Sequence, residues 1–113
     1  MAFDISYITT DVTIANGSAT SAAIDVPDGL SPVGFITPSA LTSTAATFTV
    51  SVDGTNFYAL KKNDGSASIS YTVAASGYYP MNPADWCGIA NFKIVVGSAE
   101  AAARTITLVF RPI

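Results

Sequence analysis

Residues 47–60, TFTVSVDGTNFYAL, decide the fold class, because they contain two strand-forming runs separated by a turn. The first run alternates hydrophobic with hydroxyl residues, which is the pattern of a strand with one buried face, and its hydrophobic members are Phe48, Val50 and Val52. Asp53-Gly54 follows at the reversal, where glycine supplies the positive φ of a tight turn. The stretch therefore predicts an antiparallel hairpin, with Leu60 joining the first run in the core and Tyr58 at its rim.

The same alternation recurs in three later segments. The residues that we expect to face the core are Ile69, Tyr71 and Val73 in 66–73, Phe92, Ile94 and Val96 in 91–97, and Ile106, Leu108 and Phe110 in 104–111. Turn-forming pairs separate the segments at intervals near the roughly 8–12 residues typical of sandwiches and barrels. We therefore expect an all-β fold, an antiparallel β-sandwich of jelly-roll type with about eight strands, formed by residues 1–113 as a single domain.

The first third of the chain fits this pattern less regularly. Residues 3–15 are rich in strand formers and predict one bent strand or two short ones. Residues 20–26 place Ala22, Ile24 and Val26 on one side. Residues 32–38 are bounded by two prolines, which favours an edge strand or a strand that enters its sheet late.

Helical signals are confined to two short segments. In residues 81–86, Asn82 is a candidate N-cap, Pro83 occupies the first helical position and Asp85 lies in the first turn, so one turn of helix would carry Trp86 inward. Residues 98–104 contain helix formers but are too few for more than a turn.

Composition argues against several classes of protein. Charged residues make up 12% of the chain and the formal net charge is −3. Nucleic-acid binding requires a basic stripe, which five basic residues spread along the chain do not supply. The N-terminus lacks the features of a signal peptide, and no run is long enough for a membrane helix. We expect a protein made in a cytoplasm, with neither nucleic acid nor membrane as its partner.

Catalytic and metal-binding chemistry is poorly supported. The chain has no histidine, the commonest general base and metal ligand, and Cys87, the sole cysteine, is expected to pack in the interior. The acidic residues lie mostly in turns or at strand ends, where a carboxylate accepts local backbone hydrogen bonds. Residues 53–56 and 63–66 are rich in oxygen atoms but lack the acidic spacing of a calcium site. We therefore expect no enzyme, no metal and no cofactor.

Aromatic residues are the more informative group. Residues 76–86, SGYYPMNPADW, either cover one end of the core or contact a partner, and the covering interpretation is favoured. Tyr78 and Tyr79 are the candidate exceptions, and Tyr58 is the third candidate partner contact.

Several segments recur in a fixed order along most of the chain. They are PSALTSTAATFTVSVDGTNFYAL at 38–60, ISYTVAASGYYPMNPADWCGIANFKIVV at 69–96 and AARTITLVFR at 102–111. This order resembles that of small β-sandwich proteins encoded among the structural genes of tailed bacteriophages, over residues 32–111. The DGTNFY turn and the terminal AARTITLVFR are the most specific pieces. Asn91-Phe92-Lys93 departs from the pattern, because the resembled proteins tend to carry Tyr and Arg there.

The resemblance implies a head decoration or cement protein on the outside of a capsid, so a virion location. It implies the major capsid protein or other virion proteins as partners, and a homo-oligomer, with a trimer among the arrangements. A tail or appendage component is one alternative. A second follows from the similarity of the same hairpin to galactose-binding jelly rolls, which would make the chain a carbohydrate-binding module.

Overall fold

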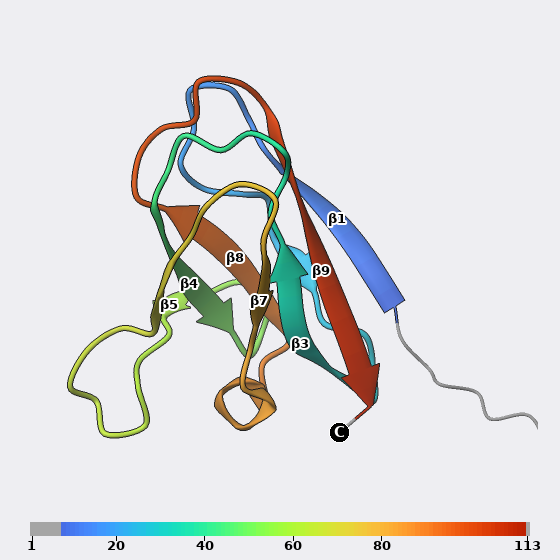
Figure 1. Ribbon diagram of the computed structural model, residues 1–113. Helices are drawn as coiled ribbons and strands as arrows, with labels where there is room; N and C mark the ends of the chain where they lie inside the picture. The colour runs from blue at the N-terminus through green and yellow to red at the C-terminus, as the bar shows by residue number, and fades with distance from the viewer. Residues whose placement is uncertain (1–7, 113) are drawn as a thin grey trace, which may run out of the picture.

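The computed structural model describes residues 8–112, and two antiparallel sheets pack face to face in it as a β-sandwich (Figure 1). The first sheet, sheet A, has the strand order β1–β9–β3–β7. Its strands are β1 (Ile8–Ile14), β9 (Arg104–Pro112), β3 (Leu30–Ile36) and β7 (Tyr78–Pro80). The part of the expected 3–15 strand that precedes Ile8 lies outside the described residues.

The second sheet, sheet B, has the order β2–β8–β4–β5, with β6 also paired to β4. Its strands are β2 (Ile24–Asp25), β8 (Asn91–Val96), β4 (Ala45–Ser51), β5 (Tyr58–Ala59) and β6 (Ser70–Thr72). One edge of β4 is taken by β8 along its length, so β5 and β6 share the other edge, at different heights.

Because β5 and β6 occupy a single strand position, the nine strands fill eight positions. The order of these positions in the two sheets is that of a jelly roll, which consists of eight strands in two packed sheets. The predicted all-β jelly-roll sandwich is thereby confirmed. Between β5 and β6 the chain leaves the sheet as a hairpin of residues 61–68, closed by the Lys61–Ser68 bridge.

The core lies between the sheets and includes the inward residues that the alternation predicts for β8 and β9. Aromatic rings fill its centre in edge-to-face contacts, as aromatic quadrupoles favour. Phe48 lies 4.9 Å from Trp86 and 6.0 Å from Phe92 between ring centroids, and Phe35 lies 5.8 Å from Phe48. Leu60 is buried as predicted, and Ile69 and Tyr71 are partly buried against this cluster.

Two residues assigned to the inward face lie at the surface instead. Strand β4 ends at Ser51, so Val52 falls in the following loop and is 73% exposed. The buried Ser51 hydroxyl accepts hydrogen bonds from the Asp53 and Gly54 amides, which ends the strand one residue before its hydrophobic pattern ends. Ala22 is exposed because it precedes β2, which is only two residues long.

Residues 32–38 form neither an edge strand nor a strand that enters its sheet late, the two alternatives that their prolines favoured, because pairing begins at Leu30. Strand β3 lies inside sheet A, between β9 and β7. Its register against β9 shifts between Pro32 and Gly34, and such a bulge accommodates a proline that cannot donate to the ladder. The proline rule fails here because the irregularity lies within the strand.

The expected helical turn forms as a 3-10 helix, η1 (Pro83–Trp86), which carries Trp86 into the core. Asn82 is its N-cap, and the Asn82 side chain accepts a hydrogen bond from the Ala84 amide at 3.1 Å. Residues 98–104 form bends that lead into β9. No helix in residues 8–112 is long and apolar enough to cross a membrane.

Candidate contact surface and cleft

The three tyrosines proposed as partner contacts lie apart and in different environments. Tyr58 is in β5 of sheet B and is 65% exposed. Tyr79 stacks on Phe35 with ring centroids 5.2 Å apart, and its hydroxyl accepts a hydrogen bond from the Ala74 amide at 2.7 Å. These contacts place Tyr79 among the packing residues, whereas its neighbour Tyr78 points to the opposite, outer face of sheet A.

Tyr78 lies across strand β3. Its ring covers Gly34 so closely that a side chain on Gly34 would collide with it, and its hydroxyl donates to the Val33 carbonyl at 3.4 Å. The residue is nevertheless 53% exposed. A glycine in the middle of a strand often marks such a close approach.

Strand register places further apolar side chains beside Tyr78. Gly34 pairs with Pro80 on one side and with Val109 on the other, while Ile36 pairs with Tyr78. Ile36 also pairs with Thr107 on β9, whose hydroxyl donates to Asp11 at 2.8 Å. We call the apolar outward residues of these rows the sheet A patch, and they are Ile36, Tyr78, Pro80 and Val109. Ile36 is 40% exposed, so the patch presents apolar surface on three adjacent strands.

The polar groups at the start of the DGTNFY loop, residues 53–58, are hydrogen-bonded to one another. The Asp53 carboxylate accepts hydrogen bonds from the Thr55 and Asn56 amides at 2.8 and 2.9 Å. These bonds and the Asn56 side chain lower the pKa of Asp53 well below its usual range. Gly54 has the predicted positive φ, 80°. Asp53 is thus the turn former that the sequence predicts.

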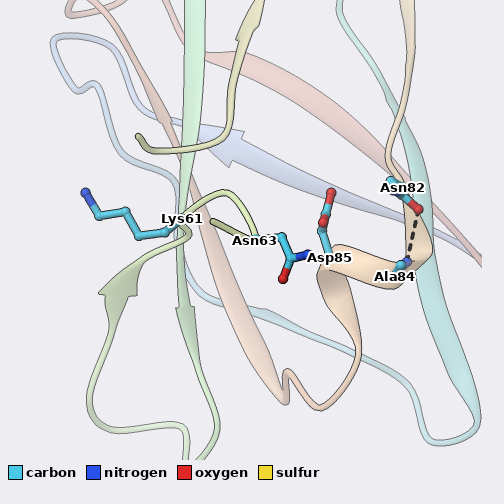
Figure 2. Close-up of a pocket in the computed structure, with 5 residues that line it drawn as sticks. All are labelled: Lys61, Asn63, Asn82, Ala84 and Asp85. Carbon is cyan, nitrogen blue, oxygen red and sulfur yellow. Dashed lines mark hydrogen bonds between the residues drawn. The ribbon is translucent and has the colours of Figure 1, made fainter. Parts of the chain in front are cut away.

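A cleft of about 450 Å³ opens between the 61–68 hairpin and η1. Figure 2 shows Asn63 on the hairpin side and Asn82, Ala84 and Asp85 on the helix side, while the Lys61 side chain extends away from η1. In sequence these residues belong to a turn and a helix cap, and no local pattern indicates that the two segments face each other. Sequence reasoning therefore missed the cleft.

The negative charge of Asp85 acts on Tyr71, which is partly buried against the core. Burial raises the pKa of the Tyr71 phenol, and the nearby negative charge of Asp85 raises it further. Lys61 supplies the opposite charge on the far side, where its side chain extends away from η1 (Figure 2). The cleft therefore has a carboxylate on its helix wall and a lysine at its outer rim.

At the other end of the sandwich, Glu100 is buried, with 0% of its side chain exposed. Its Oε1 accepts hydrogen bonds from the Thr42 amide at 2.8 Å and the Arg104 Nε at 3.0 Å. Its Oε2 accepts from the amide and hydroxyl of Ser43 at 3.0 and 2.6 Å. Burial alone would raise the pKa of Glu100, but the hydrogen bonds outweigh it and lower the pKa to about 2. From the sequence, Glu100 is only one of several acidic residues in turns or at strand ends.

Cys87 is exposed, directly after η1, so the prediction of a packing cysteine is wrong. The 3-10 helix is one turn long, and only its last residue, Trp86, reaches the interior. The described part of the chain contains no group of three or more acidic, cysteine or histidine residues placed to hold a metal ion.

Comparison with known proteins identifies similarity in fold. No protein-family model matches the chain, and no curated protein matches it significantly. The SPBc2 prophage-derived protein YomS superposes with a TM-score of 0.57 at 14% identity, covering 97% of this chain and 98% of its own. A chain of Bacillus endospore appendages, described as disulfide-linked pili, gives 0.44 at 15% identity, covering 95% and 84%. A chain of the cyanophage Pam1 capsid gives 0.39 at 14% identity, covering 97% and 86%. The likeness to YomS shows a common fold, and the other two are too distant to support an argument.

Fold and surface together define a jelly-roll sandwich that exposes an apolar patch on sheet A and a polar cleft at one end.

Proposed function

We propose that this protein is a non-enzymatic virion structural protein of a tailed bacteriophage, a decoration or cement protein that binds the outside of the capsid. The sheet A patch is the observation that carries the proposal. Contiguous exposed apolar surface marks protein interaction sites more often than singly scattered hydrophobic residues do. The order of sequence segments supports the proposal, and a prophage-derived protein with the same fold is consistent with it.

The patch suits attachment to a protein lattice. Burying apolar surface contributes about 25 cal/mol per Å², and a stable interface buries on the order of 1,000 Å² or more. Exposed tyrosine ranks among the side chains that dominate such interfaces, and Tyr78 is fixed against Gly34 before any partner binds. Little ordering entropy is therefore lost when the patch is covered.

Stabilisation of the shell follows from linkage. A protein that binds the assembled lattice but not loose subunits shifts the equilibrium toward the assembled state by mass action. The proposal includes the major capsid protein as partner, a homo-oligomer such as a trimer on the lattice, and a location in the virion. It includes neither catalysis nor binding of nucleic acid; the formal net charge of −3 suits the latter expectation.

The test measures binding of the purified chain to expanded capsids that lack it, together with the melting temperature of those capsids. We expect saturable binding and a higher melting temperature. Ile36→Lys introduces a charge into the patch and should weaken binding at least about ten-fold, corresponding to about 1.4 kcal/mol. Val52→Lys makes the same change at an exposed loop valine and serves as the matched control.

Equal melting temperatures with and without the chain, and no binding, would show that the cement function is wrong. Binding to purified tails in place of capsids would instead assign the chain to a tail or appendage. Equal loss of affinity in Ile36→Lys and Val52→Lys would remove the sheet A patch from the interface.

A further inference from the structure

The cleft lies where the fold departs from eight continuous strands. A single strand paired along the free edge of β4 would complete the jelly roll. Here that strand position is divided between β5 and β6, and the 61–68 hairpin is inserted between them. The insertion carries Lys61 and Asn63 to the wall opposite η1. Figure 1 shows the hairpin and η1 at the same end of the sandwich.

Polar groups around the cleft lack partners within the described chain. The side chains of Lys61, Asn63 and Asp85 make no hydrogen bond or ion pair within residues 8–112. Asn82 uses only its Oδ1, which accepts from the Ala84 amide. A carboxylate and two amides therefore line the cleft with donors and acceptors available, and the Lys61 ammonium lies at its rim.

We propose that this cleft binds a neutral hexose unit of a glycan. The Asp85 carboxylate in the cleft disfavours an anionic ligand and the Lys61 ammonium at the rim disfavours a cationic one, which leaves a ligand without net charge. The hydroxyl groups of a sugar both donate and accept, which matches the carboxylate and amide groups present, and the Ala84 methyl offers an apolar contact for ring C–H groups. The volume of about 450 Å³ lies within the roughly 300–1,000 Å³ of small-molecule sites.

Affinity for a single sugar should be weak. None of the five residues lining the cleft has an aromatic ring on which a sugar could stack, so a Kd of about 1 mM is expected. Many copies on one particle would raise the effective affinity by avidity. That avidity rests on the proposed virion function, whereas binding by the isolated chain does not.

The experiment titrates the isotopically labelled, isolated protein with D-galactose, D-glucose and D-mannose to about 50 mM, far above a millimolar Kd. We expect saturable shifts of the backbone amide signals of Asn63, Ala84 and Asp85 with at least one sugar. Asp85→Asn should raise the Kd about ten-fold, because hydrogen bonds to a charged group are the stronger ones. Asn63→Ala tests the opposite wall, in case the helix variant is perturbed.

Asp28→Asn makes the same chemical change at an exposed carboxylate in the turn before β3 and should leave the Kd within about two-fold. The absence of saturable shifts with all three sugars would overturn the proposal, as would an unchanged Kd in both Asp85→Asn and Asn63→Ala. Ile36→Lys should bind sugar normally. The capsid-binding proposal and the sugar-binding proposal can therefore fail independently of each other.

Discussion

Replacing Glu100 by glutamine should destabilise the fold strongly and in a pH-dependent manner. Every group that contacts the carboxylate is a donor, two on each oxygen. In either orientation the NH₂ of glutamine would face two donors, of which at least one is a backbone N–H that cannot turn away. Leaving a buried donor unsatisfied costs about 1–3 kcal/mol, and more beside a charged group.

The lowered pKa gives an independent magnitude. A fall from the ordinary value of 4.5 to about 2 in the folded state corresponds to about 3 kcal/mol of stability at neutral pH. Because the folded pKa is the lower one, this contribution is complete above about pH 4.5 and is lost as the pH falls toward 2. The difference between wild type and Glu100→Gln should therefore shrink over that window.

The assay is urea unfolding followed by the fluorescence of Trp86, the sole tryptophan, which is 2% exposed in the fold. Free energies of unfolding are compared at pH 7 and in steps down to pH 2.5, with Asp28→Asn as the matched control at an exposed turn. We expect Glu100→Gln to lose about 3 kcal/mol at pH 7 and the control less than about 0.5. A loss below 0.5 kcal/mol for Glu100→Gln, or a loss that is the same at both ends of the range, would refute the reasoning.

Three further predictions concern the surface and the core. Gly34→Ala should displace the Tyr78 ring and cost about 1–2 kcal/mol, measured by urea unfolding; an unchanged stability with unchanged Tyr78 chemical shifts would contradict the contact. Cys87 should react with a thiol reagent in the native protein at the rate of a free thiol, with one thiol modified per chain. If it reacted only after unfolding, Cys87 would be buried and not exposed. Val52→Ala should change stability by less than about 0.5 kcal/mol, whereas Val96→Ala, in the core, should cost about 2; equal effects would place Val52 in the core after all.

The alternation of residue types was sufficient to predict the two-layer fold and most of its core. The alternation predicts the inward residues of β8 and β9 correctly, because both strands are paired with neighbours along their whole length. The pattern fails at Val52, since the end of a strand is set by the hydrogen bonds of Ser51 and Asp53, which are independent of hydrophobicity. The two prolines give β3 the wrong place, because a bulge between Pro32 and Gly34 cannot be inferred from composition.

The candidate surfaces were less accessible to sequence reasoning. Tyr78 and Tyr79 are adjacent and chemically identical, and only strand register separates a packed ring from an exposed one. Glu100 and the residues of the cleft acquire their significance from segments far away in the chain, as with the 58-residue separation of Thr42 and Glu100. Such long-range pairings depend on topology, which local patterns do not encode.

The strand position beside β4, which is divided between β5 and β6, also makes the protein suited to carrying inserted peptides. The 61–68 hairpin is closed at its base by the Lys62 amide bonded to the Ala67 carbonyl and has Gly65 near its tip. Sheet pairing resumes on both sides of it, so the core does not depend on its length, and doubling a loop costs only about 0.6 kcal/mol in closure entropy. A tag or epitope inserted after Gly65 would project from the end of the sandwich, away from the sheet A patch, and would convert the native chain into a display scaffold.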